Sequence, residues 1–386
     1  MLEKNSRERI EKALNHKESD RIPLGFDAHC CGIHIKTYRK LRESLGLDPE
    51  KAKVFDRIQQ LGGLDQDFKE QINNDAEGIY SNPPSGWEFK REDRDKYWEF
   101  TDEFGIRWRM PKEGGFYYDM WDHPLKKADS IKDIEALEFF DPQDPARFEN
   151  VAEQFASAAR LGKAPVFNPN TGGIFEMALW LRGFEEFYQD MILNPGMAEA
   201  LLDKTLDYKK KFWEKALEAA GEEILVVAEA DDIASQDSLL VSPDMYRKFI
   251  KPRHKELFSH IKKQAKSRAY IWYHSCGAVK RLLPDLIEEG VDIINPVQLS
   301  AADMNAEELK REFGKDLVFW GGGIDTQKAL PNFSPEEVKE ATKRNIENLA
   351  PGGGFVFAPV HNVQADVPAE NFFAMLEGLE EINNNR

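Results

Sequence analysis

Short apolar runs rich in β-branched and aromatic residues recur along this chain, and helical patterns separate most of them. Eight such runs lie at residues 22–26, 77–80, 164–168, 223–228, 269–274, 291–294, 317–320 and 354–358. Helical stretches follow several of them, at 173–192, 242–265, 278–289, 303–313 and 335–349. Such alternation is typical of a parallel sheet, and eight repeats are what a (β/α)8 barrel requires. We therefore predict an α/β fold, a TIM barrel with an N-terminal helical extension, in which residues 1–386 form a single domain.

Local signals set several of the helix boundaries. Ser242-Pro243 and Ser334-Pro335 each place a capping residue directly before a proline at the first helical position. Gly290 follows the stretch that ends at residue 289, where a glycine commonly terminates a helix. These signals support the predicted order of strands and helices.

Residues 86–120 interrupt the alternation. Short alternating segments there are separated by the turn sequences Asp-Glu-Phe-Gly and Glu-Gly-Gly. We predict an antiparallel β meander inserted into the barrel over 86–120. It carries Trp87, Trp98, Trp108 and Trp121. These rings either roof a pocket for an aromatic ligand or form the apolar face that an inserted sheet needs for itself.

The composition excludes several classes of protein. Apolar residues make up 41% of the chain, including 25 Phe, which is enough for a large core and excludes a disordered or fibrous chain. The net charge of −17 repels the phosphate backbone of nucleic acids. No run of 18 apolar residues occurs, and the first helical stretch is too charged for a signal peptide. We expect a cytoplasmic protein with neither nucleic acid nor membrane as a partner.

Three cysteines, Cys30, Cys31 and Cys276, cannot form a disulfide framework and fit a reducing compartment, where thiolates bind metals or take part in chemistry. Cys276 belongs to the run YIWYHSCG at 270–277. Side chains alternate along a strand, so His274 and Cys276 leave its end on the same side. Imidazole and thiolate are ordinary zinc ligands. A packed core pair is the other interpretation, and spacing alone leaves both open.

A catalytic zinc site needs a third protein ligand from a separate segment. His361 follows the strand at 355–358 by three residues. The ends of parallel barrel strands meet on one face, so His361 can reach the same cavity as the His-x-Cys pair. Asp231 and Asp232 follow another strand. A carboxylate there is a fourth ligand, a general acid, or only the cap of the next turn.

Across almost the whole chain, the sequence resembles the uroporphyrinogen decarboxylase superfamily. It is more similar to the corrinoid-dependent methyltransferase branch, the relatives of methylcobamide:coenzyme M methyltransferases and of O-demethylase methyltransferases. The matching stretches are 20–24 (DRIPL), 230–235 (ADDIAS) with the helix start at 242–243, 274–277 (HSCG), 319–326 (FWGGGIDT), 358–361 (APVH) and 367–371 (VPAEN).

The resemblance implies a metal centre and a partner protein. In the zinc methyltransferases of this branch, a His-x-Cys pair and a later Cys hold the metal. The pair matches His274 and Cys276, whereas His361 occupies the position of the later Cys. The implied zinc ligands are therefore His274, Cys276 and His361. The resemblance also implies a corrinoid (cobalamin) on a separate carrier protein that docks over the barrel face, and it suggests a homodimer.

The exchange of a thiolate for an imidazole changes the charge of the predicted centre. Zinc with one thiolate and two imidazoles keeps one formal positive charge and is a stronger Lewis acid than a neutral two-thiolate centre. A cationic centre suits polarising the oxygen of a methyl ether, so that the methyl group passes to Co(I) of the corrinoid. Ligation by Asp231 would cancel this charge.

We therefore predict a zinc-dependent methyltransferase that demethylates a small methoxylated substrate, with an aromatic ether favoured by the aromatic content. His274, Cys276 and His361 hold the metal, and Asp231 is the catalytic proton handler or a fourth ligand. One alternative is methyl transfer from a methylcorrinoid to a thiol or folate. Another is a non-catalytic corrinoid-binding or metal-binding protein.

The segment at 27–32 (DAHCCG) bears on these alternatives. Decarboxylases of the family bind their substrate carboxylates through an arginine-rich segment here, and this chain has no arginine in it, which argues against decarboxylation. The spelling Asp-x-His-x-x-Gly also occurs in corrinoid-binding domains, and a metal site of His29, Cys30, Cys31 and His34 is a further alternative. We favour a loop at the pocket mouth, with Asp27 or His29 touching the substrate.

Two further residues are candidate substrate contacts. Asn170 follows the strand at 164–168, and Trp320 ends the run at 317–320 before three glycines. Both positions fall where a barrel places substrate contacts. Turn chemistry at Asn-Pro-Asn, and a tight strand-to-loop turn after Trp320, are the structural alternatives. Glu176, at a helix start, has the dipole as its simplest explanation.

Overall fold

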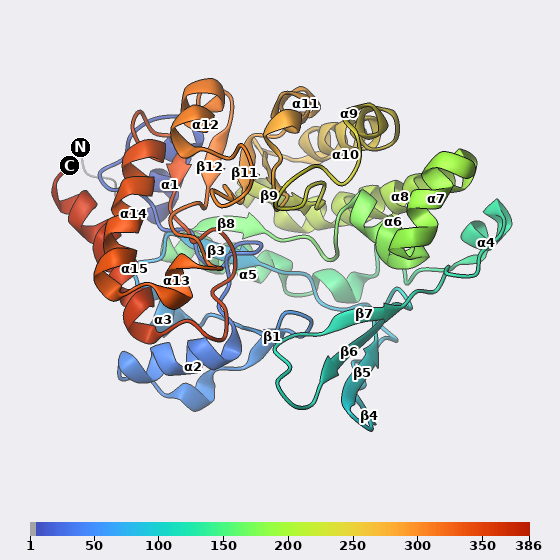
Figure 1. Cartoon of the computed structure of the whole chain (residues 1–386), viewed down its shortest axis with the longest axis horizontal. Helices are drawn as coiled ribbons and strands as arrows, with labels where there is room; N and C mark the ends of the chain where they lie inside the picture. Colours follow the sequence, from blue (N-terminus) through green and yellow to red (C-terminus); the bar gives the residue numbers. More distant parts are fainter. Residues whose placement is uncertain (1–4) are drawn as a thin grey trace.

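The computed structural model describes residues 5–386, and its centre is one curled parallel sheet (Figure 1). The strand order is β13-β12-β11-β10-β9-β8-β3. The strands are β3 (Ala76–Ile79), β8 (Ala164–Phe167), β9 (Val226–Ala230), β10 (Tyr270–His274), β11 (Ile293–Asn295), β12 (Val318–Trp320) and β13 (Phe355–Val356). Most of these strands are buried along their whole length, as expected where helices cover a parallel sheet.

Residues 22–26, the first predicted strand, close the gap between β13 and β3. Leu24 forms a parallel bridge with Phe357 on one side. On the other side, the backbone amide of Asp75 donates to the Leu24 carbonyl at 2.8 Å. The Asp75 carboxylate accepts from the Leu24 amide at 2.9 Å, and the Asn74 side-chain oxygen accepts from the Phe26 amide at 2.8 Å. The side chains of Asn74 and Asp75 thus take the place of some backbone hydrogen bonds to residues 22–26, which act as the eighth strand. The predicted barrel is confirmed.

Helices surround this sheet (Figure 1). They are α1 (Ser6–Leu14), α2 (Ile35–Ser44), α3 (Gln66–Gln71), α4 (Ile131–Ala136), α5 (Val151–Leu161), α6 (Ile174–Arg182), α7 (Phe184–Leu193), α8 (Pro195–Ala220), α9 (Pro243–Met245), α10 (Lys251–Gln264), α11 (Leu283–Glu289), α12 (Ala306–Phe313), α13 (Ala329–Asn332), α14 (Pro335–Leu349) and α15 (Ala369–Asn384). Within residues 5–386, none of the helices combines the length and apolarity needed to cross a bilayer.

Two predicted helices are interrupted. The stretch at 173–192 divides at Gly183, whose φ of 98° is a left-handed conformation that ends α6 before α7 begins. The stretch at 242–265 contains a π-helical turn at Tyr246–Ile250 between α9 and α10. Pro252, early in α10, has no N–H to donate to the preceding turn, which accounts for the local change of pitch.

The insertion is a separate antiparallel sheet with the order β4-β5-β6-β7. Its strands are β4 (Glu92–Arg94), β5 (Tyr97–Thr101), β6 (Arg107–Pro111) and β7 (Asp119–Asp122). Trp108 is buried against Phe100 and meets Trp180 of α6 edge-to-face at 5.9 Å between ring centroids. Arg107 covers Trp121 at 4.1 Å. These contacts favour the second interpretation, in which the tryptophans form the apolar face of the sheet.

A further hairpin lies near the barrel mouth, formed by β1 (Val54–Asp56) and β2 (Leu61–Gly62). The barrel interior is filled by small side chains and two tryptophans. Trp272 and Trp320 meet at 4.6 Å between ring centroids, and both are fully buried. The Trp320 indole donates to the Gly25 carbonyl at 3.1 Å. A Cβ at Gly25 would lie 2.3 Å from that indole nitrogen, so glycine is required there.

Candidate metal centre

Polar residues from three neighbouring strands meet at the carboxyl edge of the sheet. His274, the last residue of β10, is in register with Ala230 at the end of β9 and with Asn295 at the end of β11. Residues that directly follow these strands therefore emerge side by side. This register brings Asp232 beside Cys276, whose backbone amide donates to the Asp232 carboxylate at 2.7 Å.

Asn295 fixes the orientation of the His274 ring. The Asn295 side-chain nitrogen donates to the Trp320 carbonyl at 2.8 Å, so its oxygen is the atom that faces His274. That oxygen lies 2.6 Å from Nδ1 of His274, which must therefore carry the proton. Nε2 keeps its lone pair and lies 3.5 Å from the Cys276 sulfur. The imidazole is presented as a metal ligand, with an oriented outer partner of the usual kind.

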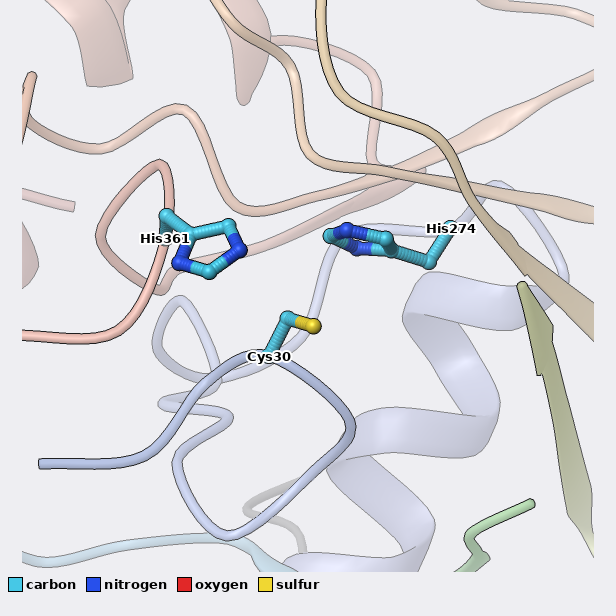
Figure 2. A group of neighbouring side chains, drawn as sticks. All are labelled: Cys30, His274 and His361. Atoms are coloured by element: carbon cyan, nitrogen blue, oxygen red, sulfur yellow. The ribbon is translucent and has the colours of Figure 1, made fainter. Parts of the chain in front are cut away.

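His361 reaches the same place from the segment after β13. Its ring centroid is 5.5 Å from that of His274. Figure 2 shows Cys30 joining them from a third segment, the loop after residues 22–26. One ligand atom each of Cys30, His274 and His361 lie within 4.8 Å of one another. The structure thus brings His361 to His274, and it adds a sulfur that spacing did not place there.

A second group of potential ligands shares His274. Ligand atoms of Asp232, His274 and Cys276 also lie within 4.8 Å of one another. The Asp232 carboxylate is 3.9 Å from Nε2 of His274, and its side chain is 40% exposed. The donors around this one imidazole are thus two sulfurs, a second imidazole and a carboxylate, a set suited to zinc.

The protein environment holds the two imidazoles and the Cys276 thiol uncharged. Loss of solvation, together with the nearby His274, lowers the pKa of His361 to about 3. Loss of solvation also lowers the pKa of His274, although Asp232 opposes the change. Burial raises the pKa of Cys276 well above its usual value, with Asp232 adding to the effect. At neutral pH both imidazoles have free lone pairs, and a bound cation would release the thiol protons.

Asp231, the predicted proton handler, faces away from these groups. Its carboxylate accepts from the backbone amides of Phe175 and Glu176, at 2.9 and 2.7 Å, at the start of α6. It also lies 2.6 Å from Nε2 of His254. A Cβ at Gly173 would lie 1.5 Å from the Ala230 carbonyl, so the helix start packs directly on the end of β9. Asp232, rather than Asp231, is the neighbour of His274.

Asp231 and Asp232 together affect Glu176. Burial raises the pKa of the Glu176 carboxyl well above its usual value, and the two aspartates raise it further. The Glu176 carboxyl therefore holds a proton more readily than an exposed glutamate does. The position that the helix dipole seemed to explain thus adds a partly buried carboxyl group near the centre.

The two candidate residues of the 27–32 loop have different surroundings. His29 packs edge-to-face on His274, with 5.3 Å between ring centroids, and lies at the site. Burial and the neighbouring His274 lower its pKa well below the usual value. Asp27 instead binds Lys69 at 3.0 Å and Tyr80 at 3.2 Å, and so anchors the loop.

Asn170 and Trp320 also lie differently from one another. The Asn170 side-chain nitrogen donates to the Tyr208 hydroxyl at 2.8 Å. Its side-chain oxygen is buried and has no hydrogen-bond partner among the described residues, so it remains an acceptor for a ligand. Trp320 fills the barrel interior below the site and is fully buried.

The alternative group of His29, Cys30, Cys31 and His34 is dispersed. Cys31 points into the barrel, where its sulfur accepts from Asn295 at 3.6 Å. His34 caps α2 and binds the Phe116 carbonyl at 2.9 Å. Cys30 and Asn295 are the residues of the centre that the sequence did not assign to it. Position at a strand end was the available signal for Asn295, whereas Cys30 sits in a loop with no such signal.

Comparisons with known proteins bear on the family and the fold of this chain. The sequence model of the uroporphyrinogen decarboxylase (URO-D) family matches residues 105–382. A curated protein named methylated-thiol–coenzyme M methyltransferase, from Methanosarcina mazei, is 27% identical over 207 residues, which are 54% of this chain and 51% of that protein. The match therefore spans about half the length of that relative. A solved methyltransferase structure from Methanosarcina mazei has the same fold, with a TM-score of 0.65 and 18% identity over 98% of this chain and 99% of that chain.

Proposed function

This chain belongs to the uroporphyrinogen decarboxylase family, and we propose that it is a zinc-dependent methyltransferase of corrinoid-linked metabolism. The observation that carries the proposal is the gathering of potential ligands around His274 at the carboxyl edge of the barrel, with His361 and Cys30 in one group and Cys276 and Asp232 in another. The lone pair of His274 faces the sulfur of Cys276 at 3.5 Å, and the ring of His361 lies beside it. In TIM-barrel enzymes this edge is where chemistry takes place.

Of these side chains, His274, Cys276 and His361 would hold the metal. Two neutral imidazoles and a sulfur that loses its proton on binding match the ligands that zinc takes in catalytic sites. Asn295 supports the set because it fixes which nitrogen of His274 is free. Bound zinc would supply a Lewis acid that polarises the methylated atom of the substrate and stabilises negative charge on the leaving group.

Other residues of the chain would position the substrate and handle protons. His29 packs on His274 and borders the space beside the centre. The unpartnered oxygen of Asn170 would accept a hydrogen bond from a substrate hydroxyl or amine. Asp231 would act by holding the start of α6. That helix carries Glu176, whose pKa is raised by burial and by the two aspartates, and this carboxyl would supply the proton to the leaving group. In this account Asp231 is a positioning residue.

For the substrate, we propose a small methyl ether, with an aromatic ether favoured. The three ligands leave one formal positive charge on the centre, which suits withdrawing electrons from an ether oxygen. The methyl group would pass to Co(I) of a corrinoid on a separate carrier protein. The direction of transfer then runs from substrate to cobalt.

A second candidate is methyl exchange with a thiol. The Methanosarcina mazei relative is named for methylated thiols and coenzyme M, and Cys30 lies beside the two imidazoles. A second thiolate would bring the formal charge to zero, and a neutral centre suits an electron-rich sulfur. The two candidates differ in the substrate and share the metal site.

An anaerobic assay with Co(I) cobalamin separates these candidates. The zinc-loaded protein is mixed with methyl ethers, thioethers and amines, and the cobalt spectrum is followed. We expect conversion to methylcobalamin with a methoxyarene, and no conversion in His274→Ala. His260→Ala, on the outer helix α10, is the matched control and should behave as wild type. Conversion with thioethers alone would select the second candidate, and no conversion with any compound would overturn the proposal.

A further inference from the structure

We propose that Cys30 is a fourth protein ligand of the centre, so that the resting site is closed by two sulfurs and two imidazoles. The inference rests on the proposed function, since it assumes that a metal binds at His274. It changes the chemistry of the site, because a second thiolate removes the formal positive charge and so favours the thiol candidate over the methyl ether. It also implies that a substrate atom must either displace a ligand or add a fifth one.

The placement of the donor atoms carries this proposal. Atoms of Cys30, His274 and His361 lie within 4.8 Å of one another, and Cys276 lies 3.5 Å from the same His274 nitrogen. Zinc bonds of about 2.1 to 2.3 Å in a tetrahedron separate the ligands by about 3.3 to 3.8 Å. A small contraction around an ion would bring Cys30, His274 and His361 to this spacing, and Cys276, which lies against His274, would complete a four-coordinate site by moving toward Cys30 and His361. Figure 2 shows that Cys30, His274 and His361 come from three separate segments, which surround a common point.

The backbone of the loop is strained in order to present Cys30. Cys30 has a φ of 54° and Asp27 has a φ of 65°, and neither residue is a glycine. Non-glycine residues in this conformation cost free energy and gather at functional sites, where the surrounding structure holds them. Lys69, at 3.0 Å, and Tyr80, at 3.2 Å, hold the Asp27 carboxylate and thereby the start of the loop.

The end of the loop is fastened to the segments that carry the two imidazoles. The Gly32 amide donates to the side chain of Asn362 at 2.7 Å, and Asn362 directly follows His361. The Cys31 sulfur accepts from Asn295, the same residue that orients His274. Cys30 is thus set between the two imidazoles by contacts on both sides, which is the preorganisation that a metal site needs.

Asp232 is the other donor near the centre, and the structure gives it a different task. Its carboxylate accepts from the Cys276 backbone amide at 2.7 Å and remains partly exposed. It belongs to the group with Cys276, on one side of His274, whereas Cys30 belongs to the group that contains both imidazoles. Asp232 is therefore an outer partner of Cys276.

Cobalt(II) substitution of the full-length protein tests this assignment without any assay of activity. Thiolate-to-Co(II) charge transfer absorbs in the near ultraviolet, and its intensity grows with the number of Co–S bonds. We expect Cys30→Ser and Cys276→Ser each to lose about half of the wild-type intensity per bound cobalt, because each removes one of two thiolates. Cys31→Ser is the matched control for the neighbouring cysteine, because its hydroxyl keeps an acceptor for Asn295. Asp232→Asn is the control for the carboxylate, because its amide oxygen keeps an acceptor for the Cys276 amide. Both should keep the full intensity per bound cobalt.

The outcomes distinguish this proposal from the proposed function. If Cys30→Ser binds cobalt with undiminished charge-transfer intensity while Cys276→Ser loses its band, Cys30 is not a ligand and the three-ligand site stands. If wild-type protein binds no cobalt at all, the proposed function fails together with this inference. Circular dichroism of each variant shows whether it is folded, and the serine exchange is close to isosteric, so loss of about half of the intensity per bound cobalt in a folded Cys30→Ser supports ligation.

Discussion

Asn295 is the residue on which the orientation of His274 depends. Its side-chain oxygen lies 2.6 Å from Nδ1 of His274. We expect Asn295→Leu to lower zinc affinity about 10- to 100-fold, as loss of an outer partner of a metal-bound histidine commonly does. Asn295→Asp keeps an acceptor in place and should retain the affinity. Competition titration with a chromophoric chelator measures both variants. Equal affinities of the leucine variant and wild type would show that Asn295 does not orient a ligand.

His254 makes the stability of the protein depend on pH. Burial alone would lower its pKa, but hydrogen bonds and charges from Asp231 and Glu289 raise it to about 9, above the ordinary value of 6.5. A raised pKa in the folded state stabilises the protein fully below pH 6.5, and this stabilisation is lost as the pH rises through about 9. We expect the free energy of unfolding to fall by up to about 3 kcal/mol over this window.

Urea unfolding at a series of pH values measures this effect. The control is His254→Gln, which cannot gain a charge and should have a flatter dependence on pH at a lower overall stability. Parallel pH profiles for His254→Gln and wild type would contradict the prediction.

At the residue scale, the sequence pointed to those candidate ligands that lie on or just after a strand. His274 and Cys276 share one strand end, so alternation alone puts them on the same side. The sequence could not show which of Asp231 and Asp232 lies beside His274. The answer depends on β9 ending at Ala230 and on which carboxylate accepts from the first amides of α6. Cys30 could not be assigned, because loop contacts with distant segments place it.

Asp75 holds residues 22–26, which complete the barrel although they do not form a regular strand. Its fully buried carboxylate accepts from the Leu24 amide and binds Arg9 at 2.7 Å. We expect Asp75→Ala to reduce the free energy of unfolding by about 3 kcal/mol, because it leaves the buried Leu24 amide without its acceptor and the buried Arg9 guanidinium with Asp20 alone. Denaturant unfolding provides the measurement.

Glu218→Ala is the control for this change. Glu218 pairs with Lys215 on the surface of α8 at 2.8 Å, and its loss should leave the unfolding midpoint unchanged. If Asp75→Ala were as stable as Glu218→Ala, residues 22–26 would not depend on this side chain.

At the scale of elements, the strands were the more predictable part. All eight predicted runs coincide with strand segments of the barrel. They were recognisable because buried parallel strands are apolar along their whole length. The capping residue predicted at Ser334 is present at the start of α14. The breaks at Gly183 and at the π-helical turn were missed, since a single glycine or an early proline is tolerated in many helices and only tertiary packing decides.

At the scale of the whole molecule, closure of the barrel brings together residues that lie more than three hundred positions apart in the sequence. Cys30 follows the first strand segment of the barrel and His361 follows the last. These segments are neighbours only because residues 22–26 pair with the segment after β13. The eightfold alternation made this adjacency predictable for His361. The residues contributed by loops were not predictable, because loop conformation depends on contacts that a strand pattern does not encode.

Anomalous diffraction at the zinc edge, on crystals of zinc-loaded protein, tests the central claim most directly. We predict one strong peak within bonding distance of Nε2 of His274, the Cys276 sulfur and a ring nitrogen of His361. Crystals of His274→Ala, grown and soaked in the same way, should lack it. A peak that contacts none of these three side chains, or no peak in the wild-type crystals, would contradict the account.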